Sequence, residues 1–398
     1  MLFRSKHALI DFIRNLRKWM DHSIDIGRRD DGLCHAYYLL SFGDTGFGLE
    51  ALDVMLEGQV ALLESGYLSP KASRDLLSAL RRSELYCEKH RSYLLYPDRG
   101  RPGFLSRNCV PRATLSEFPV IEAAVRDNRC RYLIRDSEGQ VRFAGCYRNA
   151  RELGEALEAD RAPKEEAQAV KALYERTFQH QKFTGRSGRM FKFEGLGCVY
   201  WHMVSKLALA AARVATQARL LECEDDLCDA LYQSYVEIRE GLGVHSSARE
   251  YGAFPTDPYS HSPGFSGVKQ PGLTGQVKED VLSRYLELGV HMDAGTVSFL
   301  PVLLSRDEFL VKAETWSFRL GDETRTEELQ AGTLAFCLCG TPIIYRIAED
   351  SGITVFDSAG GKHGLTGNEL GVQWSSALFD RNRDIQKIVV NVRPEQLR

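Results

Sequence analysis

Apolar residues recur every three or four positions along the first 288 residues, whereas short β-branched and aromatic runs dominate from residue 289 onward. The first period is that of an amphipathic helix, and the second pattern is that of strands. We therefore predict a mainly α plus β protein, with a helical domain over 1–288 and a β domain over 289–398. Helices are predicted over residues 2–20, 48–65, 70–83, 150–159, 164–180, 196–221, 225–241 and 276–288.

Local signals refine the helical region. Ser69-Pro70 supplies an N-cap and a first-turn proline, and Pro163 does the same before Lys164. Residues 131–145 differ, because two apolar runs flank the turn sequence Asp136-Ser137-Glu138-Gly139. This pattern predicts a β-hairpin inserted among the helices.

In the C-terminal region, strand-like runs are separated by turn residues at intervals of about ten. Such spacing is typical of an antiparallel β-sandwich or jelly roll. The runs are 296–299, 315–318, 333–336, 343–345, 353–356 and 388–392.

Residues 243–274 show neither period. The segment contains His245, Tyr251, Phe254, Tyr259 and His261. Long aperiodic loops inside compact domains are usually functional, and loops on rigid scaffolds carry binding residues. We predict that this loop forms the wall of a site; a loop that only pins the β region to the helices is the alternative.

The charge balance limits the classes of partner. The chain has 51 Lys and Arg against 54 Asp and Glu, a formal net charge of −3. No global basic field is available to hold nucleic acid or an anionic membrane, whereas a neutral or small-anion substrate suits this balance. The ten cysteines form no CxxC pair, which predicts reduced thiols and a cytoplasmic location.

No run approaches the length of a transmembrane helix. Residues 1–20 place apolar side chains at helical spacing among Arg and Lys, which predicts an amphipathic helix packed on a core rather than a signal peptide. Cys337-Leu338-Cys339 has no second ligand pair, so we expect no metal.

Two turns could carry chemistry. Thr274-Gly275 opens a predicted helix, where backbone N–H groups favour an anion; an ordinary N-cap is the alternative. Arg28-Arg29-Asp30-Asp31-Gly32 follows the first helix. It is either a solvated turn, with Asp30 as the surface partner of the arginines, or the source of a general acid.

A third segment offers Arg186 and Arg189 with two hydroxyls, which suits a phosphate or sugar hydroxyls. It lacks the P-loop pattern. Tyr200, Trp201 and His202 are consecutive on a predicted helix and cannot share one face. We expect Trp201 or Tyr200 in the core, and whether His202 reaches a pocket stays open.

One succession of motifs is specific. It comprises Pro258-Tyr259-Ser260-His261, glycines at 264, 267 and 272, Thr274-Gly275, and the run from Leu286 to Pro301. This order resembles the C-terminal part of inverting glycoside phosphorylases of the cellobiose and chitobiose phosphorylase type. The strings at 31–40, 55–61, 194–207 and 251–263 are similar to those of much longer, mostly uncharacterised bacterial proteins.

The resemblance implies an (α/α)₆ barrel followed by a jelly roll. It implies that Thr274, Gly275 and either His261 or His245 bind phosphate, and that Asp31 is the general acid. The sequence departs from the family at the acid, because Arg28, Arg29 and Asp30 stand where the family has Asp-Trp-Asn. Eight or nine helices are too few for the twelve of this barrel. We therefore expect an incomplete barrel, the C-terminal part of a longer protein, completed by a second copy or an N-terminal chain.

Three functions follow from these observations. The first is inverting phosphorolysis of a β-linked gluco-oligosaccharide, with inorganic phosphate as co-substrate and no cofactor. Arg186 would join the phosphate site, and Tyr259, Phe254, Trp201 and Asp257 would contact sugar. The second is an inverting hydrolase or transglycosylase, with Asp257 or Glu279 as the second carboxylate. The third is a non-catalytic saccharide-binding remnant.

Overall fold

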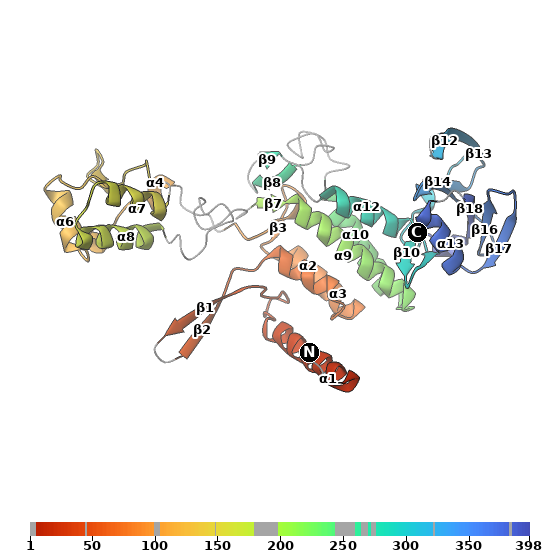
Figure 1. Cartoon of the computed structure of the whole chain (residues 1–398), viewed down its shortest axis with the longest axis horizontal. Helices are drawn as coiled ribbons and strands as arrows, with labels where there is room; N and C mark the ends of the chain where they lie inside the picture. The colour runs from red at the N-terminus through yellow and green to blue at the C-terminus, as the bar shows by residue number, and fades with distance from the viewer. Residues whose placement is uncertain are drawn as a thin grey trace. The chain divides into compact units, whose positions relative to one another are not determined.

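The computed structural model describes two compact units, of which the second is inserted into the sequence of the first (Figure 1). The main unit comprises Met1–Leu95 and Val199–Arg398, and the inserted unit comprises Tyr96–Cys198. The described residues are 5–43, 46–98, 104–147, 149–178, 198–242, 259–263, 270–271, 276–320, 323–381 and 384–398.

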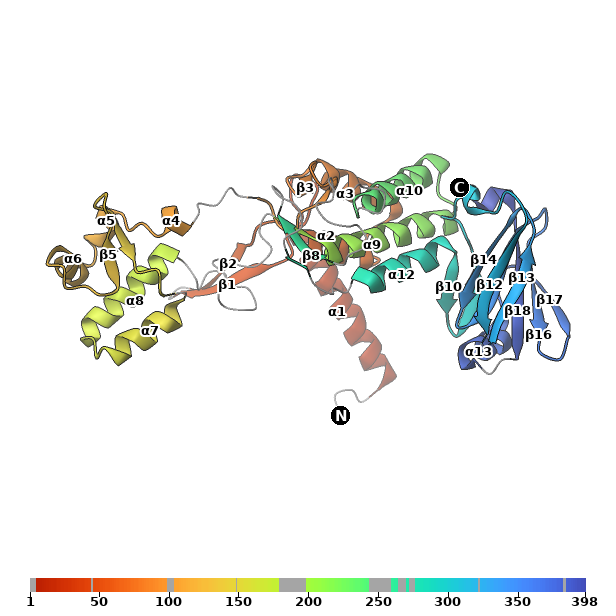
Figure 2. The ribbon, with the colours of Figure 1, turned by 90° about the horizontal axis from the view of Figure 1, so that it is seen from above.

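Helix α9 (Trp201–Leu220) is the centre of the main unit. Most of its 20 residues are buried, and many of these are alanines, whose small side chains let neighbouring helices approach closely. Helices α10 and α12 run along it, as both views show (Figure 2). The helices packed on α9 are α2 (Leu56–Glu64), α3 (Pro70–Arg82), α10 (Asp225–Glu240) and α12 (Gln276–Glu287).

The N-terminal helix is present but is not packed as predicted. Ser5 caps α1 (Lys6–Ile26) by accepting a hydrogen bond from the Ala8 amide. No residue of α1 is buried, so within the described part of the chain its apolar stripe faces solvent. The expectation that this helix packs on a core is therefore wrong for these residues. The exposed apolar residues of α1 are Leu9, Phe12, Ile13, Leu16, Trp19, Met20 and Ile26.

A β-hairpin follows, formed by β1 (Tyr38–Gly43) and β2 (Gly46–Ala51). The predicted helix over 48–65 therefore begins only at Leu56. Phe42 is opposite Phe47, and Leu40 is opposite Leu49. All four side chains are exposed, although an isolated two-stranded hairpin is at best marginally stable in water.

The C-terminal region is rich in strands, as predicted. Two antiparallel pairs precede a five-stranded sheet of order β14-β15-β18-β16-β17. Strands β15 and β18 pair in parallel, and all other neighbours in this sheet are antiparallel. The strands are β10 (Val290–Asp293), β11 (Thr296–Phe299), β12 (Glu314–Leu320), β13 (Glu323–Leu329), β14 (Thr333–Leu338), β15 (Thr341–Ile347), β16 (Gly352–Asp357), β17 (Lys362–Thr366) and β18 (Ile385–Val392).

Sequence analysis missed helix α13 (Gly371–Asp380), which packs against β11. Its buried Ser375 accepts a hydrogen bond from the Val297 amide at 2.9 Å. The apolar residues of the strands and of α13 form one core, which includes Phe299, Tyr345 and Leu378.

The inserted unit has a core of its own, in which Phe143 packs edge-on to Tyr174 and close to Phe178. The predicted hairpin is confirmed, and the helices predicted over 150–159 and 164–180 are both present. The elements are α4 (Phe104–Arg107), α5 (Arg112–Leu115), α6 (Pro119–Arg126), β5 (Leu133–Arg135), β6 (Val141–Phe143), α7 (Ala150–Ala159) and α8 (Lys164–Phe178).

None of the ten cysteines takes part in a disulfide in the structure. None of the described helices combines the length and the apolar character needed to cross a lipid bilayer.

A buried carboxylate ties α10 to α12 and to the segment before the long strands. Glu287 is 3% exposed and accepts hydrogen bonds from Tyr235 and Arg239 on α10 and from Arg284 on its own helix. Arg284 also pairs with Glu308 at 2.5 Å. The carboxylate is buried only because three donors compensate its lost hydration.

Glu287→Ala should lower the free energy of unfolding by about 3 kcal/mol, because it removes this acceptor from the buried Tyr235 hydroxyl and from Arg239 and leaves Arg284 with Glu308 alone. Urea denaturation followed by circular dichroism measures this change. Glu308→Ala is the matched control, and its cost should stay below about 1 kcal/mol because Glu308 is exposed. Equal costs for the two variants would contradict the assignment of Glu287 as the tie between these elements.

Candidate functional site

Part of the predicted site loop is a strand. Residues Tyr259–Pro263 form β8, which lies between β7 (Cys198–Tyr200) and β9 (Gln270–Pro271) in a three-stranded sheet. Strand β7 runs directly into α9, so the sheet brings the strand that carries Tyr259 and His261 to the start of α9 (Figure 1). Residues 259–263 of the segment predicted to be a loop are therefore anchored to the start of the central helix.

The first two residues of α9 point in different directions, Trp201 into the core and His202 toward α12. Trp201 is fully buried and lies edge-on to His90, at 6.2 Å between ring centroids. This is the core position that one interpretation of the sequence predicted, and it leaves no ring face for a sugar. His202 is 17% exposed in its side chain and points instead toward α12.

His202 and Glu279 form a close pair between α9 and α12. Nε2 of His202 lies 3.2 Å from Oε2 of Glu279, and its Nδ1 lies 3.3 Å from the Tyr200 hydroxyl. Glu279 is 3% exposed, and the ammonium of Lys278 lies 3.3 Å from its Oε1. Lys278 and Glu279 both lie in the first turn of α12, where the helix dipole favours negative charge.

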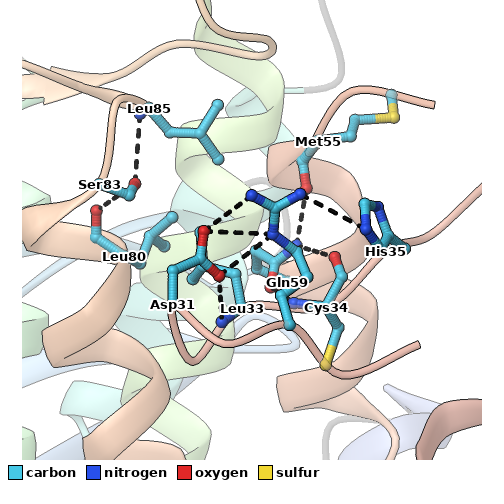
Figure 3. Close-up of polar contacts among 10 residues, drawn as sticks. Asp31, Leu33, Cys34, His35, Met55, Gln59, Leu80, Ser83 and Leu85 are labelled. Carbon is cyan, nitrogen blue, oxygen red and sulfur yellow. Dashed lines mark hydrogen bonds and ion pairs between the residues drawn. The ribbon is translucent and has the colours of Figure 1, made fainter. Parts of the chain in front are cut away.

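The proposed general acid lies in a separate turn after α1. Asp31 accepts hydrogen bonds from the Arg29 guanidinium at 2.8 and 3.1 Å and from the Leu33 amide at 3.1 Å (Figure 3). Arg28 pairs with Asp25 at 3.0 Å. The expectation that Asp30 is the partner of the arginines is therefore wrong.

The hydrogen bond from Arg29 is the largest effect on the pKa of Asp31 and lowers it. Burial opposes this to a smaller extent than Arg29, and the hydrogen bond from the Leu33 amide lowers the pKa further. A general acid needs a carboxyl group that keeps its proton near neutral pH. In this arrangement Arg29 opposes that role.

A buried glutamine that sequence analysis missed fixes the chain just after Asp31. Gln59 accepts a hydrogen bond from the Cys34 amide at 3.0 Å, and its side-chain amide donates to the Cys34 carbonyl at 2.8 Å and the Met55 carbonyl at 3.1 Å (Figure 3). Next along the chain, Nε2 of His35 lies 3.5 Å from the Arg29 guanidinium. The only signal for this role in the sequence was the amide side chain of Gln59 within the largely apolar stretch of residues 55–63.

The predicted site residues are thus distributed over several places. Among the described residues, no hydrogen bond or ion pair joins Asp31 to α9 or α12. For Tyr259 and His261 only the backbone is described. The remaining predicted residues lie outside the described part of the chain: Arg186, His245, Phe254, Asp257, Thr274 and Gly275.

Comparison with known families bears on the inserted unit. Residues 101–181 match the family model of the GH149 phosphorylase insertion domain 2. The match falls inside the inserted unit, whose flanking residues Leu94 and Val199 are neighbours in a β-bridge of the main unit. It supports a glycoside phosphorylase-like family, although not the cellobiose and chitobiose group in particular. No curated protein matches the chain.

Arg29→Gln should raise the pKa of Asp31, because the guanidinium is the largest cause of its lowered value. Carboxyl ¹³C chemical shifts recorded across a pH titration measure this change. Arg28→Gln is the matched control and should leave Asp31 unchanged, since Arg28 pairs with Asp25. An unchanged Asp31 titration in Arg29→Gln would show that another group holds this carboxylate ionised.

Proposed function

We propose that this chain carries the catalytic region of an inverting glycoside phosphorylase, which uses inorganic phosphate to cleave a β-linked gluco-oligosaccharide to a sugar 1-phosphate. The observation that carries the proposal is the match of residues 101–181 to a phosphorylase insertion domain. The motif succession from Pro258 to Pro301 supports it independently. An (α/α)₆ barrel with a jelly roll remains part of this proposal.

The proposed reaction makes two demands on the protein. Phosphate attacks the anomeric carbon while the glycosidic oxygen leaves and takes a proton from a general acid. Because phosphate is itself the nucleophile, no second carboxylate is needed to activate water, in contrast to an inverting hydrolase. The protein must therefore hold a phosphate dianion and deliver one proton.

For the phosphate we propose Thr274 and Gly275, which immediately precede α12, with His261, His245 and Arg186 as further candidates. We add His202 to these candidates, because its Nε2 lies 3.2 Å from Glu279 in the first turn of that helix. Helix N-termini bind anions through free backbone N–H groups and the dipole. Lys278 and His202 both face Glu279, so the turn already pairs a carboxylate with groups that can bear positive charge.

For the proton we propose Asp31. The role requires that the carboxyl group regain a proton, and Arg29 is the group whose displacement favours this most. Tyr259, Phe254 and Asp257 stay candidate sugar contacts.

Two alternative functions can be distinguished by measuring the release of sugar and of phosphate. A hydrolase would release sugar without phosphate, and would use Glu279 or Asp257 as its base. A non-catalytic remnant would bind saccharide without turnover. The exposed apolar residues of α1 and of the β1–β2 hairpin support a second copy or a complementing chain. Light scattering of the purified chain distinguishes a homodimer from a monomer.

Phosphate release from glucose 1-phosphate, as α and then β anomer, should depend on a gluco-oligosaccharide acceptor. Asp31→Asn should abolish this release and leave the circular dichroism spectrum unchanged, because in this synthetic direction the acid of phosphorolysis acts in reverse and takes the proton of the acceptor hydroxyl, which an amide cannot do. Asp30→Asn is the matched control and should retain activity. Full activity in Asp31→Asn would remove this residue as the acid, and folded wild-type protein without release would favour the alternatives.

Thr274→Val should raise the KM for phosphate at least about tenfold in the phosphorolytic direction, because a hydrogen bond to a charged group is lost. The KM for the oligosaccharide should change little. Thr326→Val, at an exposed position of β13, serves as control for the substitution itself. A phosphate KM unchanged by Thr274→Val would place this hydroxyl outside the site.

A further inference from the structure

A cavity of about 510 Å³ lies between the end of α1, residues 34–38 and α2. Residues 34–38, which form one wall of it, come directly after the Asp31 turn in sequence. Neither Asp31 nor any residue proposed to bind phosphate is part of its lining. We propose that this cavity is a saccharide-binding subsite, which takes a neutral gluco-oligosaccharide. The choice of a glucan as ligand rests on the proposed function.

The walls of the cavity are built before any ligand arrives. Gly58 on α2 lets the helix approach residue 36, since a Cβ at this position would lie only 2.5 Å from that of Ala36. The His35 amide donates to the Gly27 carbonyl at 2.8 Å. Tyr67 ties α1 to the segment after α2 through a 2.8 Å hydrogen bond to Asp25. A largely preformed cavity of this volume is typical of small-molecule sites.

The lining suits a sugar. Tyr37 and Tyr38 are 48% and 40% exposed, so their rings are accessible. Aromatic rings with a polar tip bury the C–H face of a ligand at little conformational cost. Ser23 and Ser65 also line the cavity, and each hydroxyl donates a hydrogen bond to a backbone carbonyl of the preceding helical turn.

Two further polar side chains, those of His35 and Glu57, belong to the lining. Nδ1 of His35 is buried and has no hydrogen-bond partner in the described structure, and such an atom calls for a ligand or water. Among the described residues, the Glu57 carboxylate has no ion-pair partner. Burial raises the pKa of the Tyr37 phenol, and the negative charge of Glu57 adds to this rise. The described residues of the lining include no Lys or Arg, which disfavours a phosphate or another anion.

The cavity is also connected to the proposed acid. His35 lines it, and the other ring nitrogen of His35 lies 3.5 Å from Arg29, the partner of Asp31. A smaller cavity of about 230 Å³ beside Arg29 and Gly32 shares Cys34 and Leu62 with it. A saccharide in the larger cavity would therefore lie along the segment that carries Asp31.

Isothermal titration of the whole chain with cellotriose, and separately with laminaritriose, tests the proposal in the absence of phosphate. Wild type should show saturable binding of at least one of them. Tyr37→Ala should weaken that binding at least about fivefold through loss of ring contact. Tyr37→Phe should change it less than about twofold. Glu57→Gln should weaken it to an intermediate extent.

Phe47→Ala is the matched control, because Phe47 is an exposed aromatic residue on β2 outside the cavity. Unchanged binding in Phe47→Ala together with the loss in Tyr37→Ala is the expected result. No binding by folded wild-type chain, or binding that Tyr37→Ala leaves intact, would overturn the proposal. Binding without phosphate release would contradict only the proposed function, whereas release with intact binding in Tyr37→Ala would contradict only the subsite.

Discussion

The burial of α9 is the constraint on which the main unit depends. A helix with apolar residues around most of its circumference cannot remain in water, so other helices must cover it. Helices α2, α3, α10 and α12 do so, and their positions follow from that requirement. The contact between His202 and Glu279 is a consequence, because α12 lies along α9 and its first turn reaches the start of that helix. Glu287 then fixes the far end of α12 against α10.

The same arrangement explains how a whole unit can be inserted without disturbing the core. The chain leaves the main unit after Leu95 and re-enters at Val199, and the bridge between Leu94 and Val199 keeps these two points side by side. The inserted residues therefore need only satisfy their own core around Phe143 and Tyr174. A family model that covers the insertion alone is consistent with this independence.

The sequence predicted most helices and strands because local periodicity carries that information. It failed where the deciding contact is distant or the pattern ambiguous. The apolar run before Leu56 fits either period, and the structure resolves it as the β1–β2 hairpin. The parallel pairing of β15 with β18 joins segments separated by two strands and a helix. The pair of His202 and Glu279 likewise depends on how α12 packs against α9, which spacing within either helix does not encode.

The turn after α1 shows the same limit at the scale of single residues. Asp30 and Asp31 are indistinguishable by composition, yet Gly32 adopts a positive φ of 83° and the turn places Asp31, not Asp30, against Arg29. The result bears directly on chemistry, since the cation that orients this carboxylate also lowers its pKa. Proton donation by Asp31 requires the opposite change. Any ligand that draws the guanidinium away from Asp31 removes the largest cause of the lowered pKa. Binding of such a ligand therefore raises the pKa of Asp31, for electrostatic reasons alone. A cavity that contacts Arg29 through His35 is therefore placed where an occupant can influence the acid.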